Sequence, residues 1–290
     1  MRCRQRHRAA STARVRSALP RVESDGVIRA VGHRHLACCA VHIGSSAKRR
    51  RQGRHIMESM DEDPVSAARR AGRHAIDERA GKRLLSSYGV TVPRSRVVTR
   101  VEDVDAAMSA LKTPVVVKVM SPDILHKSDV GGVKLHLHSA LEVASAIRCM
   151  RDDPRIEGAR IDGFLIEEMA PAGHELVVGG LRDPQFGPLI MVGLGGIFVE
   201  VLKDVSFRLC PISRIDAEEM LAELKGAALL QGARGTTPAS IDAIIEVLLN
   251  VGGEQGLLMQ HAADICEADI NPLIVSDTAA IAVDARFILG

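Results

Sequence analysis

At 290 residues with 46% hydrophobic content, the chain is large enough for a packed core, which excludes an intrinsically disordered protein. With no Trp, one Tyr and five Phe, it lacks the aromatic surfaces on which single-stranded nucleic acids stack. The net charge of +2 conceals a division, because residues 1–56 contain 14 Lys and Arg against 2 Asp and Glu, whereas residues 57–290 contain 24 against 34.

The basic segment 1–56 is rich in Arg, Ser, Ala and His and shows no sustained period of helix or strand, so we expect it to be disordered. An Arg-rich, acid-poor organelle presequence fits this composition, as does an arm that contacts phosphates through Lys48 to Arg51. The third explanation is a start codon assigned too early, with translation beginning at Met57 or Met60. The abrupt change of composition at Met57 favours this third explanation.

The acidic segment 57–290 is expected to form the folded domain, starting with a helix over 67–85 that Gly89 and Pro93 end. Short apolar runs alternate with longer helical patterns after it. Further helices are expected over 103–111, 140–150, 216–225 and 239–249, and strands over 115–119, 132–137, 164–169, 175–181, 189–192, 207–211, 268–275 and 279–287. This order predicts an α+β protein with mixed but largely antiparallel sheets, on which the helices pack.

Two of these strands have distinct patterns. Residues 115–119 form a continuous β-branched run, which is typical of a strand buried on both faces. In the segment 132–137, Val133, Leu135 and Leu137 alternate with polar residues, which predicts a half-buried strand with these three side chains on one face.

The chain shows no features of a secreted or membrane-inserted protein. Its six cysteines contain no CxxC pair and no metal-ligand spacing, and a domain of this size needs no disulfide. No run approaches the roughly 18 uncharged apolar residues of a membrane span, and the N-terminus has no continuous apolar signal segment. We therefore expect a reducing, cytoplasmic environment and no contact with a membrane.

The stretch VVVKVMSPDILHKSDVGGVKL contains the first group of candidate site residues. Lys118 lies at the end of a buried strand, where its ammonium is costly unless it meets an anion such as a nucleotide phosphate or reaches solvent. Gly131 and Gly132 form a loop whose backbone N–H groups can approach phosphate oxygens. His126 precedes this loop and can accept a phosphoryl group, because neutral imidazole is a strong nucleophile near neutral pH; a structural histidine is the alternative.

A second stretch, from Phe164 to Ile212, contains acids at the ends of its predicted strands. Glu167, Glu168 and Glu175 could hydrogen-bond adenine and ribose, or could face water. The glycines that follow lack the GxGxxG order, so a dinucleotide site of the Rossmann type is disfavoured.

The third stretch, EADINPLIVSDTAAIAVDARFIL, is expected to form a β-hairpin. With a period of two, Asp269 and Asn271 share one face, and Asp284 lies on the returning strand. Oxygen ligands converging there suit Mg²⁺, which binds one or two carboxylates, nucleotide phosphates and water. A solvated strand face with a turn at Asn271-Pro272 is the alternative.

These blocks resemble a known family. Lys118 and the sequences SPDILHKSDVGGV, DPQFGP, GLGGIFVEVLKDV, RG at 234–235 and DINPL…DAR are similar, in this order, to the ATP-grasp subunit of ADP-forming acetate-CoA ligases and related acyl-CoA synthetases. The similarity covers about residues 65 to 289.

The resemblance implies an ATP-grasp fold, in which two α+β subdomains clasp ATP or ADP. It assigns Lys118 to the phosphates and the hinge Glu167-Glu168-Met169 to the adenine side, and it assigns Mg²⁺ to Asp269, Asn271 and Asp284. Many relatives have Glu in place of Asp269. His126 matches the histidine that passes a phosphoryl group to ADP, a relay in which a partner histidine first takes the group from an acyl phosphate.

The resemblance also implies a partner. The sequence contains no CoA-binding region, so we expect a separate CoA-binding subunit to complete acyl-CoA synthesis in a hetero-oligomer, while this chain binds the nucleotide. Three other functions stay open: a non-catalytic, nucleotide-binding regulatory subunit, an ATP-grasp ligase of another carboxylate substrate, and the corresponding part of a protein lysine acetyltransferase.

Overall fold

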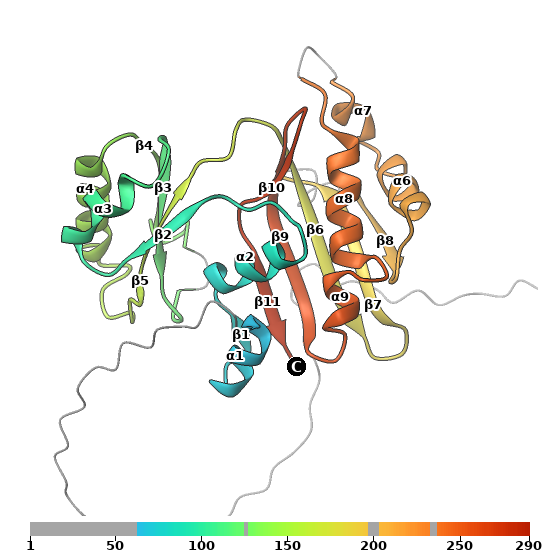
Figure 1. Cartoon of the computed structure of the whole chain (residues 1–290), viewed down its shortest axis with the longest axis horizontal. Coiled ribbons are helices and arrows are strands. Elements are labelled where there is room, and N and C mark those ends of the chain that lie inside the picture. The colour runs from blue at the N-terminus through green and yellow to red at the C-terminus, as the bar shows by residue number, and fades with distance from the viewer. Residues whose placement is uncertain (1–62, 125–126, 197–202, 233–236) are drawn as a thin grey trace, which may run out of the picture. The chain divides into compact units, whose positions relative to one another are not determined.

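The structure of the chain, a computed structural model, describes residues 63–124, 127–196, 203–232 and 237–290 (Figure 1). These residues fall within the single compact unit 57–290. The basic segment 1–56 lies outside the described residues, so its separation as a domain stays a prediction.

The described residues form two antiparallel sheets with helices packed on them, which confirms the predicted α+β class. The helices are α1 (Pro64–Arg70), α2 (Glu78–Ser87), α3 (Val104–Met108), α4 (Ala140–Arg151), α6 (Arg214–Ala222), α7 (Ala227–Leu230), α8 (Ile241–Gly252) and α9 (Leu257–Gln260), with the short 3-10 helix η1 (Val101–Asp103). The strands are β1 (Ala75–Ile76), β2 (Ser95–Val98), β3 (Val115–Met120), β4 (Val133–Leu137), β5 (Gly163–Glu168), β6 (His174–Asp183), β7 (Gly187–Leu194), β8 (Val205–Leu209), β9 (Ile265–Val275), β10 (Ala280–Ala282) and β11 (Arg286–Leu289).

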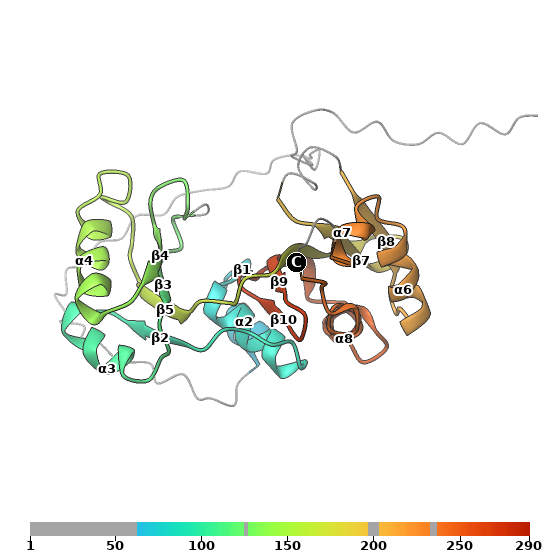
Figure 2. The ribbon, with the colours of Figure 1, turned by 90° about the horizontal axis from the view of Figure 1, so that it is seen from above.

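The smaller sheet has the strand order β2-β5-β3-β4 among the described residues. Helices α3 and α4 cover one of its faces (Figures 1 and 2). Val115, Val117 and Val119 of β3 point into the core beneath these helices. Because side chains alternate along a strand, Val116 and Lys118 point to the other face, which these two helices do not cover.

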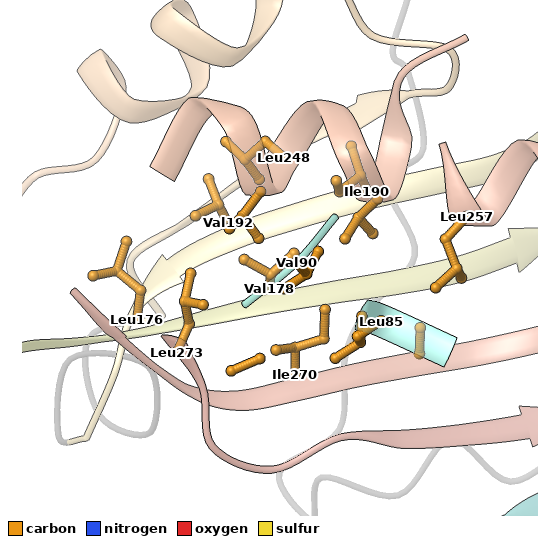
Figure 3. Packing of buried hydrophobic residues seen from close by; sticks show 14 of the residues in the cluster. Leu85, Val90, Leu176, Val178, Ile190, Val192, Leu248, Leu257, Ile270 and Leu273 are labelled. Atoms are coloured by element: carbon orange, nitrogen blue, oxygen red, sulfur yellow. The ribbon is translucent and has the colours of Figure 1, made fainter. Parts of the chain in front are cut away.

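The larger sheet has the order β1-β11-β9-β6-β7-β8, and β10 pairs with the end of β9. Helices α6, α8 and α9 pack against β7, β8 and β10 (Figures 1 and 2). Figure 3 shows the apolar layer between them, in which Leu248 of α8 lies near Ile190 and Val192 of β7. On β9, Ile270 and Leu273 belong to this core, and Asp269 and Asn271 lie outside it.

The helix predicted over 67–85 is wrong, because two helices and a short strand occupy this segment. Helix α1 ends at Arg70, and Gly72 follows with φ +65°, a conformation that interrupts a helix. β1 then pairs with β11, Ile76 lying opposite Phe287. The side chain of Asp77 accepts the N–H of Ala80 and starts α2. A pairing partner more than 200 residues away along the chain gives no local signal.

Two further expectations need correction. The closing strand predicted over 279–287 is divided into β10 and β11, which pair with different parts of β9. On β4, Leu135 is 55% exposed although the alternation placed it with Val133 and Leu137. Here the pairing with β3 is irregular, and β4 is the edge strand of its sheet, so the local period does not decide burial. Among the described helices, none combines the length and apolarity needed to cross a membrane.

The core beneath α8 predicts a large effect of one truncation. Leu248 has no exposed surface, so Leu248→Ala should lower the free energy of unfolding by about 2–5 kcal/mol through lost contacts and a cavity. The control Leu141→Ala truncates a leucine that is 84% exposed on α4 and should change it by less than about 0.5 kcal/mol. Urea denaturation of both variants measures the difference, and equal losses would contradict the placement of α8.

Candidate functional site

Lys118 is 6% exposed on β3, and anionic groups surround its ammonium. Its Nζ donates to Oε1 of Glu78 at 2.6 Å and to the carbonyl oxygen of Val283 at 2.9 Å. Burial by itself would lower the pKa of Lys118, but the carboxylates of Glu78, Glu167 and Asp284 outweigh burial and raise the pKa. The buried lysine therefore has protein anions as its partners.

Glu167 is the second carboxylate beside Lys118. Its Oε2 lies 2.9 Å from Nζ of Lys118, yet this buried oxygen accepts no hydrogen bond among the described residues. The two atoms are close enough for an ion pair, but the geometry is not that of a hydrogen bond. The ion pair is the relevant interaction, because attraction between charges depends on their distance rather than on direction. Oε1 of Glu167 accepts from Nζ of Lys82 at 2.6 Å.

Lys82 closes a ring of alternating charges, since its Nζ also donates to Oε1 of Glu78 at 2.8 Å. We call Glu78, Lys82, Lys118 and Glu167 the charged quartet. Burial alone would raise the pKa of Glu78, but the surrounding lysines, Lys118 first, outweigh burial and lower it. Burial and the charge of Lys118 lower the pKa of Lys82 despite its two carboxylate partners.

Local structure places the quartet. Glu78 and Lys82 are one helical turn apart on α2, and Glu78 is its first residue. On the small sheet, Val116 lies opposite Glu167, so Lys118 and Glu167 are diagonal neighbours on the face that α3 and α4 do not cover. The bond from Lys118 to Val283 then reaches the connection between β10 and β11 of the larger sheet.

The glycine loop packs tightly against β3. A Cβ on Gly132 would lie 2.6 Å from Cγ1 of Val119, and Gly131 has φ +72°. The N–H of Gly132 donates to the carbonyl of Lys127 at 2.7 Å, and that of Gly131 to the carbonyl of Ser128 at 3.2 Å. Both N–H groups are thus satisfied within the loop, and their predicted contact with phosphate would have to replace these bonds.

His126 lies outside the described residues, so its role stays a prediction. The same holds for residues 197–202 and for the Arg234-Gly235 pair. The next residue after His126, Lys127, is described: its Nζ donates to Oε2 of Glu78 at 2.5 Å. Lys127 thereby joins the loop to the charged quartet.

The predicted metal ligands lie at the β9 end of the site. Asp269 and Asn271 are on the face of β9 that the helices do not cover, and Asp284 follows Val283, the residue that binds Lys118. Burial, followed by the charge of Asp284, raises the pKa of Asp269. The two carboxylates therefore lie in each other's field, a situation that a divalent cation would relieve.

These residues fit Mg²⁺ better than a metal bound by protein ligands alone. Among the described residues, no group of three or more His, Cys, Asp or Glu could hold a metal ion. Two carboxylates and one amide oxygen are a typical protein share for Mg²⁺, which completes its shell with phosphate oxygens and water.

The remaining candidates lie around the link between the sheets. Glu168 accepts the backbone N–H of Lys112 at 2.9 Å, and Sδ of Met169 accepts the N–H of His136 at 3.3 Å. Glu175 is exposed at the start of β6, where it lines a cavity of about 260 Å³. The other lining residues are Gly173, His174, Leu194, Gly195 and Leu229. Glu167 lies in the quartet, and Glu168 accepts from Lys112. Of the three predicted acids, only Glu175 therefore lines this cavity.

Sequence reasoning missed Glu78, Lys82 and Lys127. Glu78 and Lys82 read as an ordinary i,i+4 pair on an exposed helix face. Lys127 stands next to His126 and close to Gly131 and Gly132, and its own position in the sequence gives no sign of a buried partner. The one available signal was Asp77, a helix-capping residue that fixes Glu78 as the first residue of α2.

The lowered pKa of Glu78 predicts how stability depends on pH. The folded protein protonates this carboxyl less readily than the unfolded chain does, so its contribution is complete above the ordinary pKa of 4.5 and is lost as the pH falls below it. Urea denaturation between about pH 3 and pH 6 should show this loss of stability in the native protein. Glu78→Gln should make the free energy of unfolding less dependent on pH in this range. It should also lower that free energy by about 3–5 kcal/mol near neutral pH, because it leaves buried lysines without their anion.

Glu254→Gln, a change at an exposed glutamate, is the control and should keep the slope of the native protein. If the free energy of unfolding of Glu78→Gln depends on pH as strongly as that of the native protein, the buried ion pairs of Glu78 do not cause this dependence.

Comparisons with known proteins identify the family of this chain. Residues 67–289 match a family model described as an ATP-grasp domain. The chain is 42% identical over 227 residues to the beta subunit of ADP-forming acetate–CoA ligase I of Pyrococcus furiosus, a match that covers 78% of this chain and 96% of that subunit. It is 44% identical over 211 residues to ADP-forming acetate–CoA ligase I of Archaeoglobus fulgidus, covering 72% of this chain and 30% of that protein.

Among solved structures, the dinucleotide-forming acetyl-coenzyme A synthetase 1 of Ca. Korarchaeum cryptofilum, in complex with coenzyme A, Ca-AMPCP and HgCl+, has a TM-score of 0.73 at 42% identity and covers 78% of this chain and 98% of that chain. Other structures of that protein contain a phosphorylated phosphohistidine segment, or Mg-AMPPCP with this segment pointing towards the nucleotide-binding site. With a family match over most of its length and a relative that it covers almost completely, this chain is a member of the ATP-grasp family and belongs with the beta subunits of ADP-forming acetate–CoA ligases.

Proposed function

We propose that this chain is the nucleotide-binding subunit of an ADP-forming acyl-CoA synthetase, which converts an acid, CoA and ATP reversibly into acyl-CoA, ADP and phosphate. The observation that carries the proposal is the buried ammonium of Lys118, which lies within the field of Asp284, a residue of the expected metal set, on an ATP-grasp fold. Membership with the beta subunits selects this ligase class over other ATP-grasp ligases.

Phosphoryl transfer depends on positioning and on neutralising phosphate charge. Lys118 would supply positive charge from a rigid strand, because two glutamates and a carbonyl fix its ammonium. Asp269, Asn271 and Asp284 would hold Mg²⁺, which neutralises phosphate oxygens when it is bound. The exposed Glu175 and its cavity, together with Glu168 and Met169, would form the adenosine side.

His126 would be the residue that receives and passes on the phosphoryl group. In the direction of ATP synthesis, the bond from the ring nitrogen to phosphorus breaks, a terminal oxygen of ADP bonds to phosphorus, and the ring nitrogen takes up a proton. Because phosphohistidine is a high-energy donor, this transfer runs in either direction.

The partner would be a separate CoA-binding subunit in a hetero-oligomer. Relatives that are named beta subunits support such a partner. The Archaeoglobus protein is a longer chain, and this chain matches only 30% of its length, so the remaining functions would lie in a separate polypeptide here. That partner would select the acyl group. The reaction would take place in the cytoplasm.

Labelling with γ-labelled ATP tests the relay. With Mg²⁺ present, the label should pass to this chain or to its partner in an acid-labile, base-stable form, as expected of phosphohistidine. His126→Ala should abolish the label, and His138→Ala, at an exposed histidine after β4, should keep it. Undiminished label in His126→Ala would remove His126 from the mechanism.

Titration of Mg²⁺ in the presence of ADP tests the metal ligands. Asp284→Asn should weaken the apparent Mg²⁺ affinity about tenfold or more, because Mg²⁺ binding depends strongly on ligand charge. Glu246→Gln, at an exposed carboxylate of α8, is the control and should have little effect. Equal affinities in the Asp284→Asn variant and the native protein would exclude Asp284 as a ligand.

A further inference from the structure

Lys127 differs from the two lysines of the charged quartet. The quartet is neutral by itself, since its two ammonium groups alternate with two carboxylates, and its side chains are at most 8% exposed. Lys127 adds a third ammonium to Glu78, through the oxygen that the quartet lysines do not contact. Its side chain is 19% exposed, so it stands at the edge of the cluster.

The cost of releasing each lysine differs accordingly. Removing Lys118 from its partners would leave Glu167, which has no exposed surface, with only Lys82. A buried charge that loses its partner is strongly destabilising. Removing Lys127 leaves Glu78 with both Lys82 and Lys118 on its other oxygen. Lys127 is therefore the lysine of this cluster that can turn to an incoming anion at low cost.

The loop allows this movement without a change of backbone. The carbonyl of Lys127 accepts the N–H of Gly132, and Gly132 packs on Val119, so the main chain is anchored on β3. The flexible four-carbon side chain can then exchange one partner for another. Among the described residues, Glu78 is the sole ion-pair partner of Lys127.

We propose that Lys127 is a phosphate-binding residue of the nucleotide site and that Glu78 is its counter-ion in the nucleotide-free protein. This inference rests on the proposed function. A nucleotide phosphate replaces the Glu78 carboxylate on the ammonium of Lys127, and Glu78 stays bound to the quartet. Lys118 meanwhile keeps its protein partners and acts on the phosphates through its charge.

Calorimetric titration of the full chain with ATP and Mg²⁺, and separately with adenosine, tests the proposal. Lys127→Met should weaken ATP binding about tenfold to a hundredfold, the range of a lost charge-assisted hydrogen bond, and leave adenosine binding unchanged. Lys127→Gln, a second removal variant, should behave alike, and Lys127→Arg should retain ATP affinity within about threefold. Lys134→Met, at an exposed lysine of β4, is the matched control and should bind ATP as the native protein does.

The outcomes separate this inference from the proposed function. If the native protein binds no ATP, both fail. If it binds ATP and the two removal variants bind it equally well, Lys127 is not a phosphate ligand and the proposed function stands. If ATP and adenosine binding weaken together, or the unfolding midpoint falls strongly with them, the Glu78–Lys127 pair has only a structural role and the inference is overturned.

Discussion

Two buried lysines and two buried glutamates are the constraint on which the site depends; they alternate between α2 and the face of the small sheet opposite α3 and α4. Each of these charges would cost several kcal/mol to bury alone, so none is tolerable without the others. The quartet fixes α2 against the small sheet, and through the carbonyl of Val283 it connects Lys118 to the connection between β10 and β11. An ion network therefore determines where the ammonium of Lys118 and the carboxylate of Glu167 lie.

The candidate site residues lie on the sheet faces opposite the packed helices α3 and α4 of the small sheet and α6, α8 and α9 of the larger one. Helices α3 and α4 cover the face of β3 with Val115, Val117 and Val119, so Lys118 is left for the other face. On the larger sheet, Ile270 of β9 packs in the core, and its neighbours Asp269 and Asn271 are left outside it. In both sheets the alternation of side chains along a strand puts apolar core residues on one face and the polar candidate site residues on the other.

The glycine loop shows how tight packing and binding chemistry are combined. Gly132 is required because Val119 leaves no room for a Cβ, and the N–H groups of the loop are satisfied by its own carbonyls. Beside the loop, the side chain of Lys127 contacts Glu78 at the edge of the charged quartet. Glu78 is also bonded to Lys82 and Lys118, so it loses little when Lys127 leaves. Lys127 can therefore exchange its partner more easily than the other lysines of this cluster.

Several features could be predicted from the sequence because their causes are local. The β-branched run of β3, the periodic helices α4 and α8 and the glycine and proline turns between strands follow from patterns within a few residues, and they led to the correct fold class. The order of the family blocks also pointed to Lys118 and to Asp269, Asn271 and Asp284, because these residues lie within recognisable stretches of chain; their roles toward phosphate and Mg²⁺ stay predictions. The break at Gly72 escaped this reasoning because β1 exists only through pairing with β11 at the other end of the chain.

The partners of Lys118 were decided by tertiary structure alone. Glu78 and Lys82 have the spacing of a common surface pair, and Glu167 looked like an acid free to meet adenine. Burial against one another converts them into a single charged ring. The sequence by itself determined that a buried lysine needed an anion, since an isolated ammonium is too costly in the interior. Which anions it found depended on bringing α2 against the small sheet, a contact that no local pattern encodes.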